Sequence, residues 1–248
     1  MDRGSLSPKP KKNINTRFIL KSVLLVLLAF FVFLMARITL PYLPYNTDVG
    51  FLRIKQDYID IDVWRTAFFV HVYMSIWVLL AGFTQFSKGL RRSYPGLHRG
   101  LGYIYAIDVL FVTGPAGLIM GFYANGGLTS RAAFVTLAIG WITFTVIAVL
   151  KAKQGDYDAH RDFMIRSYAL TLSAVTLRAW KWSINNSFEL PPMDVYRAVA
   201  WLGWVPNLLL AEFIIWRYRY IEQRRLTNAI AARVILTSAD PKLQNSEI

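Results

Sequence analysis

The chain has 248 residues, enough for one helical bundle or one large soluble domain. A hydrophobic fraction of 55% and a mean hydropathy of +0.36 argue against a soluble domain, and the absence of cysteine excludes disulfides, thiolate metal sites and iron–sulfur clusters. The net charge of +13 lies mostly at the ends of apolar runs, so we expect a lipid bilayer and no nucleic acid as the partner.

Six apolar segments follow one another along the chain, each near the roughly 20 residues needed to cross a hydrocarbon core. Lysine and arginine are concentrated in the N-terminal tail, two alternate loops and the C-terminal tail, so the positive-inside rule places both termini in the cytoplasm. The sequence therefore predicts an all-α bundle of six transmembrane helices, N-in and C-in, in a cytoplasmic (inner) membrane. The expected spans are about 18–36, 63–86, 97–123, 133–151, 160–182 and 195–216, with cytoplasmic tails over 1–17 and 217–248.

The first span follows a basic stretch and resembles a signal peptide, but its apolar run is longer and no small-residue cleavage pattern follows, so we interpret it as an anchor. An aspartate-rich segment, 37–62, is expected outside and leads into the second span. The third span begins at the Pro95 turn, because proline suits the first turn of a helix, and it stops at 125–127.

The fourth span ends in a charged turn in which Asp156 or Asp158 is expected to cap the fifth helix. The sixth span follows a loop rich in asparagine and proline and ends in a cluster of arginines. The tail from 217 is polar, and we expect it to fray.

Ionisable side chains inside the spans are functional-site hypotheses, because burying each in lipid costs several kcal/mol unless it is partnered. Arg65, His71 and Arg178 enter from the outer side. The inner side contributes His98, Arg99, Asp108, His160, Arg161, Arg166 and Glu212.

His98 and His160 share one setting, since each begins an inward-facing helix and each is followed by arginine. The third and fifth spans run in the same direction, so the two imidazoles are expected at the same depth. One interpretation is a bis-histidine site for haem b, with propionates on Arg99, Arg161 and Arg166, in a protein that passes electrons between a quinol and a redox partner. The other is a pair of interfacial histidines beside arginines that bind lipid phosphate.

The remaining buried groups also have two interpretations each. His71 lies about two turns into its span and has two interpretations. It is a further cofactor ligand, although the fourth span offers no histidine partner, or it donates a hydrogen bond to a backbone carbonyl. Asp108 and Glu212 are expected to neutralise arginines, Asp108 pairing with Arg166, or to form a proton relay. Arg178 is expected to anchor the outer interface beside tryptophans.

A rival function is binding or transport of an anionic solute or lipid head group by Arg99, Arg161 and Arg166. Broken helices would favour transport, and Gly114-Pro115 is the one candidate that we identify in the sequence. A third alternative is a membrane assembly subunit. Hydrolytic motifs are absent from the sequence, so we do not predict a hydrolase. The sequence does not define the substrate, any other enzymatic reaction or the oligomeric state.

Three ordered segments, HVYMSIWVLLAGFTQF, YPGLHRGLGYIYAIDVL and DAHRDFMIRSYALTLSAVTLRAW, resemble the domain-of-unknown-function 2306 family of predicted bacterial membrane proteins. The resemblance covers about 64–182 and implies a bacterial inner-membrane location but no activity. A much looser similarity to the cytochrome b561 and ferric reductase haem bundles supports the haem hypothesis. The residues to which the family pattern points are His71, Gly82, Phe86, His98, Arg99, Gly102, Tyr105, His160, Arg161, Met164, Arg166, Leu177 and Arg178.

Overall fold

The computed structural model describes residues 16–86 and 88–239, and within these ranges it consists of helices joined by short connections, with no strand. The all-α prediction is confirmed. The predicted tails fall partly on 1–15 and 240–248, which lie outside the described residues. In chain order the elements are α1 (Thr16–Thr39), η1 (Leu40–Tyr42), η2 (Gly50–Ile54), α2 (Gln56–Ile59), α3 (Asp62–Gln85), α4 (Lys88–Ser93), α5 (Pro95–Asp108), the π-helical turn η3 (Val109–Thr113), α6 (Gly114–Phe122), α7 (Leu128–Lys153), α8 (Tyr157–Thr171), α9 (Ser173–Ser187), α10 (Pro192–Leu202) and α11 (Val205–Ala239).

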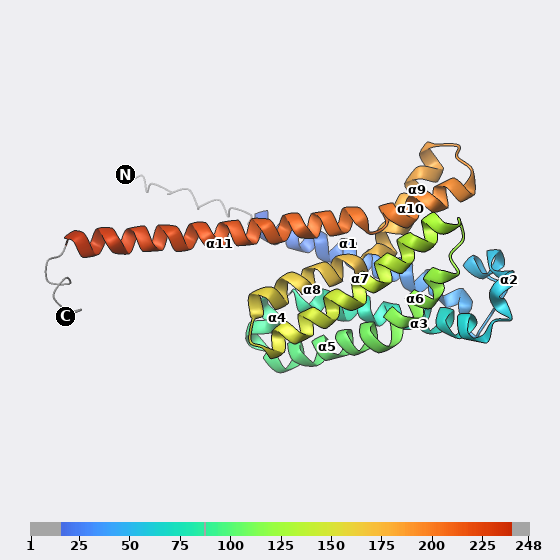
Figure 1. Cartoon of the computed structure of the whole chain (residues 1–248), viewed down its shortest axis with the longest axis horizontal. Coiled ribbons are helices and arrows are strands. Elements are labelled where there is room, and N and C mark those ends of the chain that lie inside the picture. Colours follow the sequence, from blue (N-terminus) through green and yellow to red (C-terminus); the bar gives the residue numbers. More distant parts are fainter. Residues whose placement is uncertain (1–15, 87, 240–248) are drawn as a thin grey trace, which may run out of the picture.

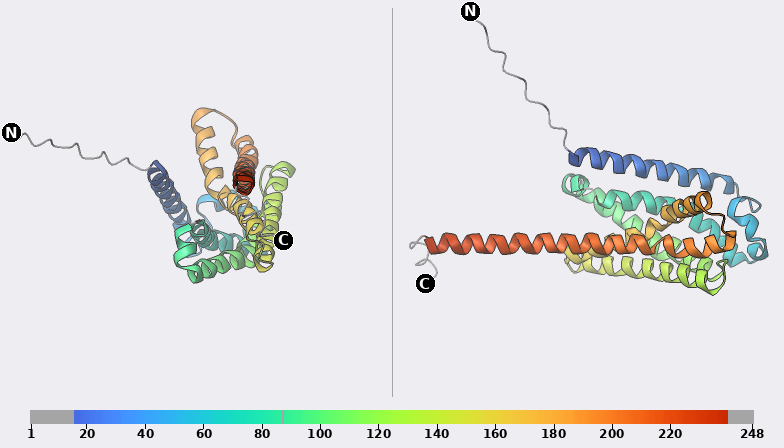
Figure 2. Two further views of the ribbon diagram at one scale, coloured as in Figure 1. Left: turned by 90° about the vertical axis from the view of Figure 1, so that its left-hand side faces the viewer. Right: turned by 90° about the horizontal axis from the view of Figure 1, so that it is seen from above.

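The helices α3, α5, α6, α7 and α8 pack side by side into a bundle, with α1 along α3 and α11 along α8 (Figure 1). We call the end that carries α4 and the start of α5 and α8 the α4 end, and the opposite end the α2 end. From the α4 end α11 projects far beyond the other helices, and the α9–α10 hairpin tilts away from the bundle at the α2 end (Figure 2).

Five stretches of helix in the described ranges are long and apolar enough to cross a membrane. They begin at Leu25, Asp62, Pro95, Leu128 and Pro192. The expected span 160–182 is not one of them, because the chain breaks at Leu172 into α8 and α9, each of 15 residues. The count of six spans and the N-in, C-in orientation remain predictions.

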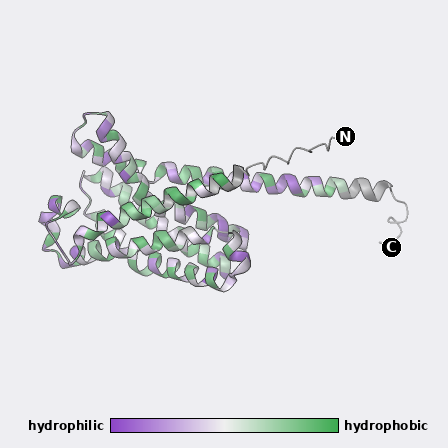
Figure 3. Ribbon diagram, turned by 180° about the vertical axis from the view of Figure 1, so that it is seen from behind, coloured by the Kyte–Doolittle hydropathy of each residue, from purple (hydrophilic) through white to green (hydrophobic). Residues whose placement is uncertain are grey.

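Apolar side chains cover the outside of the bundle as well as its interior (Figure 3). Trp77, Phe111 and Leu209 are among the large apolar residues that are mostly exposed. A soluble monomer rarely exposes so large an apolar surface, whereas a bilayer solvates it. The bundle therefore has the surface of a membrane-embedded protein.

The first irregularity of the helices is the π turn between α5 and α6. Pro115 has no backbone N–H and cannot close a regular helical bond here. Gly114 is required beside it, because a Cβ at this position would lie 2.2 Å from the carbonyl oxygen of Val109. The Gly114-Pro115 pair thus produces a break that the sequence does indicate.

Two further breaks lie next to each other, at Leu172 between α8 and α9 and at Gly203 between α10 and α11. The side-chain amide of Asn207 donates to the carbonyl oxygens of Ala169 (3.1 Å) and Gly203 (3.2 Å), one from each broken helix. It also donates to Thr176 Oγ1 (2.9 Å). Asn207 therefore satisfies carbonyls at both breaks and joins them.

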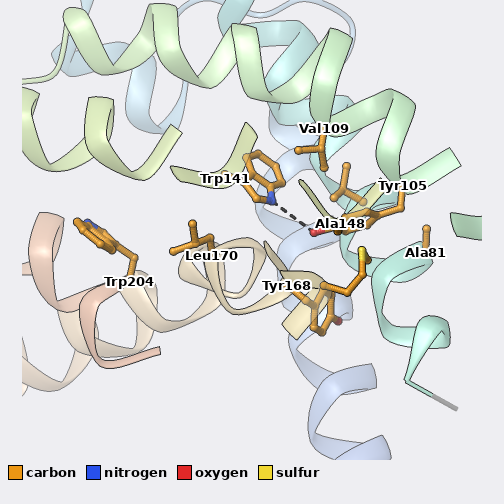
Figure 4. Close-up of a cluster of buried hydrophobic side chains, with 10 residues drawn as sticks. Ala81, Tyr105, Val109, Trp141, Ala148, Tyr168, Leu170 and Trp204 are labelled. Carbon is orange, nitrogen blue, oxygen red and sulfur yellow. Dashed lines mark hydrogen bonds between the residues drawn. The ribbon is translucent and has the colours of Figure 1, made fainter. Parts of the chain in front are cut away.

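The interior of the bundle contains a set of five buried polar side chains from α5, α7 and α8 (Figure 4 shows Tyr105 and Trp141). One arrangement of protons satisfies all of them. Trp141 Nε1 donates to Thr171 (3.0 Å), Thr171 to the Tyr105 hydroxyl (2.8 Å), Tyr105 to Ser167 (2.7 Å), Ser167 to Thr145 (2.7 Å) and Thr145 to the Trp141 carbonyl (2.8 Å). Within this closed hydrogen-bond ring each donor has an acceptor from another member. Because the members come from α5, α7 and α8, the ring links these three helices.

The end of the last helix differs from the sequence-based expectation. We predict a tail from 217, but α11 continues to Ala239. Residues 217–239 contain neither glycine nor proline, so nothing in them stops a helix, and their charged side chains solvate it.

Candidate functional site

His98 and His160 lie at the α4 end, each in the first turn or so of its helix and each half-buried. Asp156 caps α8, since its Oδ1 accepts from the backbone N–H of Ala159 (3.1 Å); this hydrogen bond holds the pKa of its carboxyl group below the usual range. The two imidazoles are within electrostatic range of each other. The two histidines that the sequence places at one depth thus lie at the same end of the bundle.

Each of these imidazoles has a ring nitrogen for which the described part of the chain provides no hydrogen-bond partner. His160 Nδ1 is 2.8 Å from the carbonyl oxygen of Ala148, and because a carbonyl only accepts, Nδ1 carries the proton and Nε2 carries a lone pair in the neutral ring. His98 Nδ1 is buried and has no hydrogen-bond partner within the described residues. For His160, a backbone carbonyl bonded to one nitrogen is the usual arrangement in a histidine that ligates a metal through the other.

Arg161 is engaged by a buried carboxylate that the sequence analysis did not identify. Its Nε and Nη2 atoms each lie 3.1 Å from Asp162 Oδ1, and Arg219 Nε on α11 donates to Asp162 Oδ2 (2.8 Å). Only 1% of Asp162 is exposed. In the sequence Asp162 stands in a charged turn with other acidic residues, and nothing in that pattern shows that this one is buried.

Arg166 pairs with Glu212 and not with Asp108, so the expected Asp108–Arg166 pair is wrong. The guanidinium binds both carboxylate oxygens, at 2.5 Å from Nε to Oε1 and 2.8 Å from Nη2 to Oε2. The reason is the order of the helices: α8 packs against α11, which carries Glu212. Sequence register alone does not give that order.

The proposed cluster of three free arginines does not form. Arg161 and Arg166 are held in ion pairs. Arg99 is exposed on α5, and no hydrogen bond or ion pair in the described part of the chain involves it. Arg91, which the sequence analysis left among the loop charges, lies within electrostatic range of His98. The free positive charge beside the histidines therefore comes from α4 and α5.

Asp108 lies at the end of α5, immediately before the π turn. It is 9% exposed, and its Oδ1 has no hydrogen-bond partner within the described residues. Thr113 Oγ1 donates to the Asp108 backbone carbonyl (3.3 Å), so the threonine covers this part of the turn.

His71 and Arg178 lie nearer the α2 end. His71 Nδ1 is 2.9 Å from the carbonyl oxygen of Thr113, which is the backbone hydrogen bond expected as one interpretation. Arg178 is exposed on α9, donates to the Ala174 carbonyl (2.6 Å) and lies within electrostatic range of His71.

Lys55, which the sequence analysis left as a loop residue, is 2% exposed in the segment between η2 and α2. Its ammonium group donates to the Tyr123 carbonyl and to Asn125 Oδ1 (2.6 Å), and lies 4.7 Å from the centre of the Tyr58 ring. Burial, reinforced by the charge of Arg131, lowers the pKa of Lys55 to about 8. Through these hydrogen bonds Lys55 joins the segment between η2 and α2 to the residues that follow α6.

The described residues contain no group of three or more histidine, aspartate or glutamate side chains placed to hold a metal ion. Several apolar helices, an apolar perimeter and paired charges inside the bundle define an integral membrane protein of the multi-helix class. The chain belongs to the domain-of-unknown-function 2306 family, described as a predicted membrane protein, whose model matches residues 68–215. No curated protein and no solved structure matches the chain, and the looser similarity to the cytochrome b561 group has no support from these comparisons.

Proposed function

We propose that this membrane protein binds haem b at the α4 end, with His98 and His160 as axial ligands, and passes electrons between a quinol and a redox partner. The observation that carries the proposal is the pair of imidazoles from two helices at one end of the bundle, within electrostatic range, each with a ring nitrogen that no group among the described residues occupies. Two neutral imidazoles are a common axial ligand set for haem in helical bundles.

The surrounding charges suit a propionate-bearing cofactor in a way that differs from the sequence-based expectation. Because Arg161 and Arg166 already neutralise carboxylates, the cations left for propionates include Arg91 and Arg99 at the α4 end. Haem bound there would supply one-electron chemistry. The chain itself would contribute the ligands and the orientation of His160 through its hydrogen bond to Ala148.

An absorbance spectrum of protein purified from haem-supplied cells tests this function. We expect a b-type spectrum that shifts on reduction by dithionite, and loss of the haem in both His98→Ala and His160→Ala. His71→Ala is the matched control, because it removes the third histidine of the chain, and we expect it to keep the spectrum. A colourless wild-type preparation, or equal haem content in all variants, would overturn the proposal.

A second candidate is the binding or transport of an anionic solute or lipid head group, which the paired breaks at Leu172 and Gly203 favour, since discontinuous helices often form transport sites. Against it, Asn207 already satisfies carbonyls at both breaks. Native mass spectrometry separates the candidates. Haem binding predicts an adduct with the mass of haem b, lost in His98→Ala, whereas anion binding predicts a lipid or solute adduct lost in Arg99→Gln.

A further inference from the structure

Arg178 is exposed, but it leaves α9 on the face that packs against α1 and α3. Val175, one turn earlier on the same helix face, packs with Met35 of α1 and Leu79 of α3 in a buried apolar cluster. The guanidinium therefore extends toward α1 and α3, where it lies within electrostatic range of His71 and of Tyr42. The anchoring role expected from the nearby tryptophans does not explain this direction.

The hydrogen-bond capacity of Arg178 is mostly unused. Its one hydrogen bond within the described residues runs from Nη1 to the Ala174 carbonyl of its own helix, and no carboxylate pairs with it. The Nε and Nη2 atoms form the edge of the guanidinium that binds oxygen atoms in pairs. An arginine at this depth costs several kcal/mol without a partner, so an acceptor at that edge would stabilise it.

His71 offers the complementary group, an acceptor. Its Nδ1 donates to the Thr113 carbonyl, so in the neutral ring Nε2 carries a lone pair. Gly117 makes room for the ring, because a Cβ there would lie 3.1 Å from His71 Cε1 and 3.2 Å from Nδ1. The position is about 13 Å along α3 from its first residue at 1.5 Å per residue, well within the thickness of a bilayer.

His71 Nε2 on α3 is an acceptor, and the guanidinium of Arg178 on α9 has free donors. A ligand group that binds both must therefore donate one hydrogen bond and accept another. A carboxylate or a quinone carbonyl only accepts and would face the His71 lone pair. A ring hydroxyl donates to His71 Nε2 and accepts from Arg178.

We propose that His71 and Arg178 bind a hydroxyl of the ring of a membrane-soluble quinol between α3 and α9. The inference rests on the proposed function in naming a quinol as the electron donor, but the binding itself does not require haem. It assigns the quinol to the α2 half of the bundle, away from His98 and His160.

Calorimetric titration of the full chain in nanodiscs with a decyl-tailed benzoquinol, under anaerobic conditions, tests the proposal. We expect saturable binding that weakens at least tenfold in His71→Phe and in Arg178→Met. The matched control for the charge is Lys181→Met, which removes an exposed cation from the same helix and should leave the affinity unchanged. The dimethyl ether of the same quinol, which cannot donate, should bind at least tenfold more weakly.

The outcomes separate this site from the haem proposal. The His98→Ala variant should bind the quinol with the affinity of the wild type even if it has lost its haem. A colourless wild-type protein that still binds the quinol would contradict the haem proposal and leave the quinol site standing. Equal affinities for the quinol and its ether, no effect of either variant, or preferential binding of oleate in a parallel titration would overturn the quinol site. If Arg178→Met does not fold, Arg178→Lys keeps the charge, loses the paired donors and should still weaken binding.

Discussion

The hydrogen-bond ring formed by Tyr105, Trp141, Thr145, Ser167 and Thr171 shows how single side chains specify this bundle. Lipid-facing helices gain little from hydrophobic burial against one another, so interhelical hydrogen bonds contribute to their choice of neighbour. Every member is engaged within the ring, which argues that it fixes packing and does not bind a ligand.

Tyr105→Phe is expected to destabilise the protein by about 1–2 kcal/mol, because Thr171 loses an acceptor and Ser167 loses a donor in a buried site. Thermal unfolding in one detergent would measure the loss. Tyr103→Phe is the matched control, since Tyr103 is 61% exposed, and we expect no change there. Equal melting temperatures for the two variants would contradict a structural role for the ring.

Lys55 gives the fold a defined pH dependence. Its pKa falls from 10.5 to about 8 on folding, so between these values the unfolded chain binds more protons than the folded one. Stability contributed by this group therefore rises as the pH increases from about 8 to about 10.5. Asp57, which acts in the opposite direction, only reduces the shift.

The difference in melting temperature between wild type and Lys55→Met measures this effect. The variant loses the hydrogen bonds to Tyr123 and Asn125 at every pH, which sets a constant offset. In addition to this offset, the melting temperature of the wild type should rise relative to that of the variant as the pH increases from 7.5 to 10. A difference that stays constant over that range would show that the amine keeps its ordinary pKa.

Among the elements, the paired breaks of α8–α9 and α10–α11 are the feature that the sequence least reveals. The residues around Leu172 contain neither glycine nor proline, so an unbroken span 160–182 is the natural prediction. Gly203 and Pro206 do signal a break, but the apolar run across them hides it. The adjacency of the two breaks depends on tertiary packing, which no local pattern records.

Asn207→Leu is expected to loosen the α9–α10 hairpin, because the Ala169 carbonyl loses the amide donor and the Gly203 carbonyl keeps only the hydroxyl of Thr176. Amide hydrogen exchange should speed up in 169–176 and 199–208 by about tenfold, while α3 and α7 stay protected. Asn186→Leu is the matched control, since that amide bonds only within its own helix to Trp182. Unchanged hydrogen exchange in Asn207→Leu would show that the Asn207 amide does not stabilise the two helix breaks.

The candidate site divides in the same way between what sequence can and cannot predict. His98 and His160 each follow a charged turn at a helix start, so their place at one end follows from sequence alone. The partner of Arg166 does not, because choosing Glu212 over Asp108 requires knowing that α8 packs against α11. Asp162 was missed since burial depends on which helix covers it.

At the scale of the whole molecule, the distribution of charge predicts an orientation in the membrane that labelling can test. The chain has no cysteine, so single introduced cysteines report their own side of the membrane. With an impermeant maleimide on intact cells, we expect labelling of Asp48→Cys and Glu189→Cys at the α2 end. Asp158→Cys and Thr227→Cys, at the other end, should be labelled only after permeabilisation, and the reverse pattern would invert the topology.

The projecting part of α11 has a consequence for what happens outside the lipid. With the bundle embedded as far as Trp216, residues 217–239 extend about 35 Å at 1.5 Å per residue, several times the screening length of about 8 Å in physiological salt. The arginines at 217 and 219 lie near its base, within the field of anionic head groups, whereas the distal turns lie beyond it. The distal turns of α11 would therefore meet the aqueous phase outside the electrostatic field of the membrane surface.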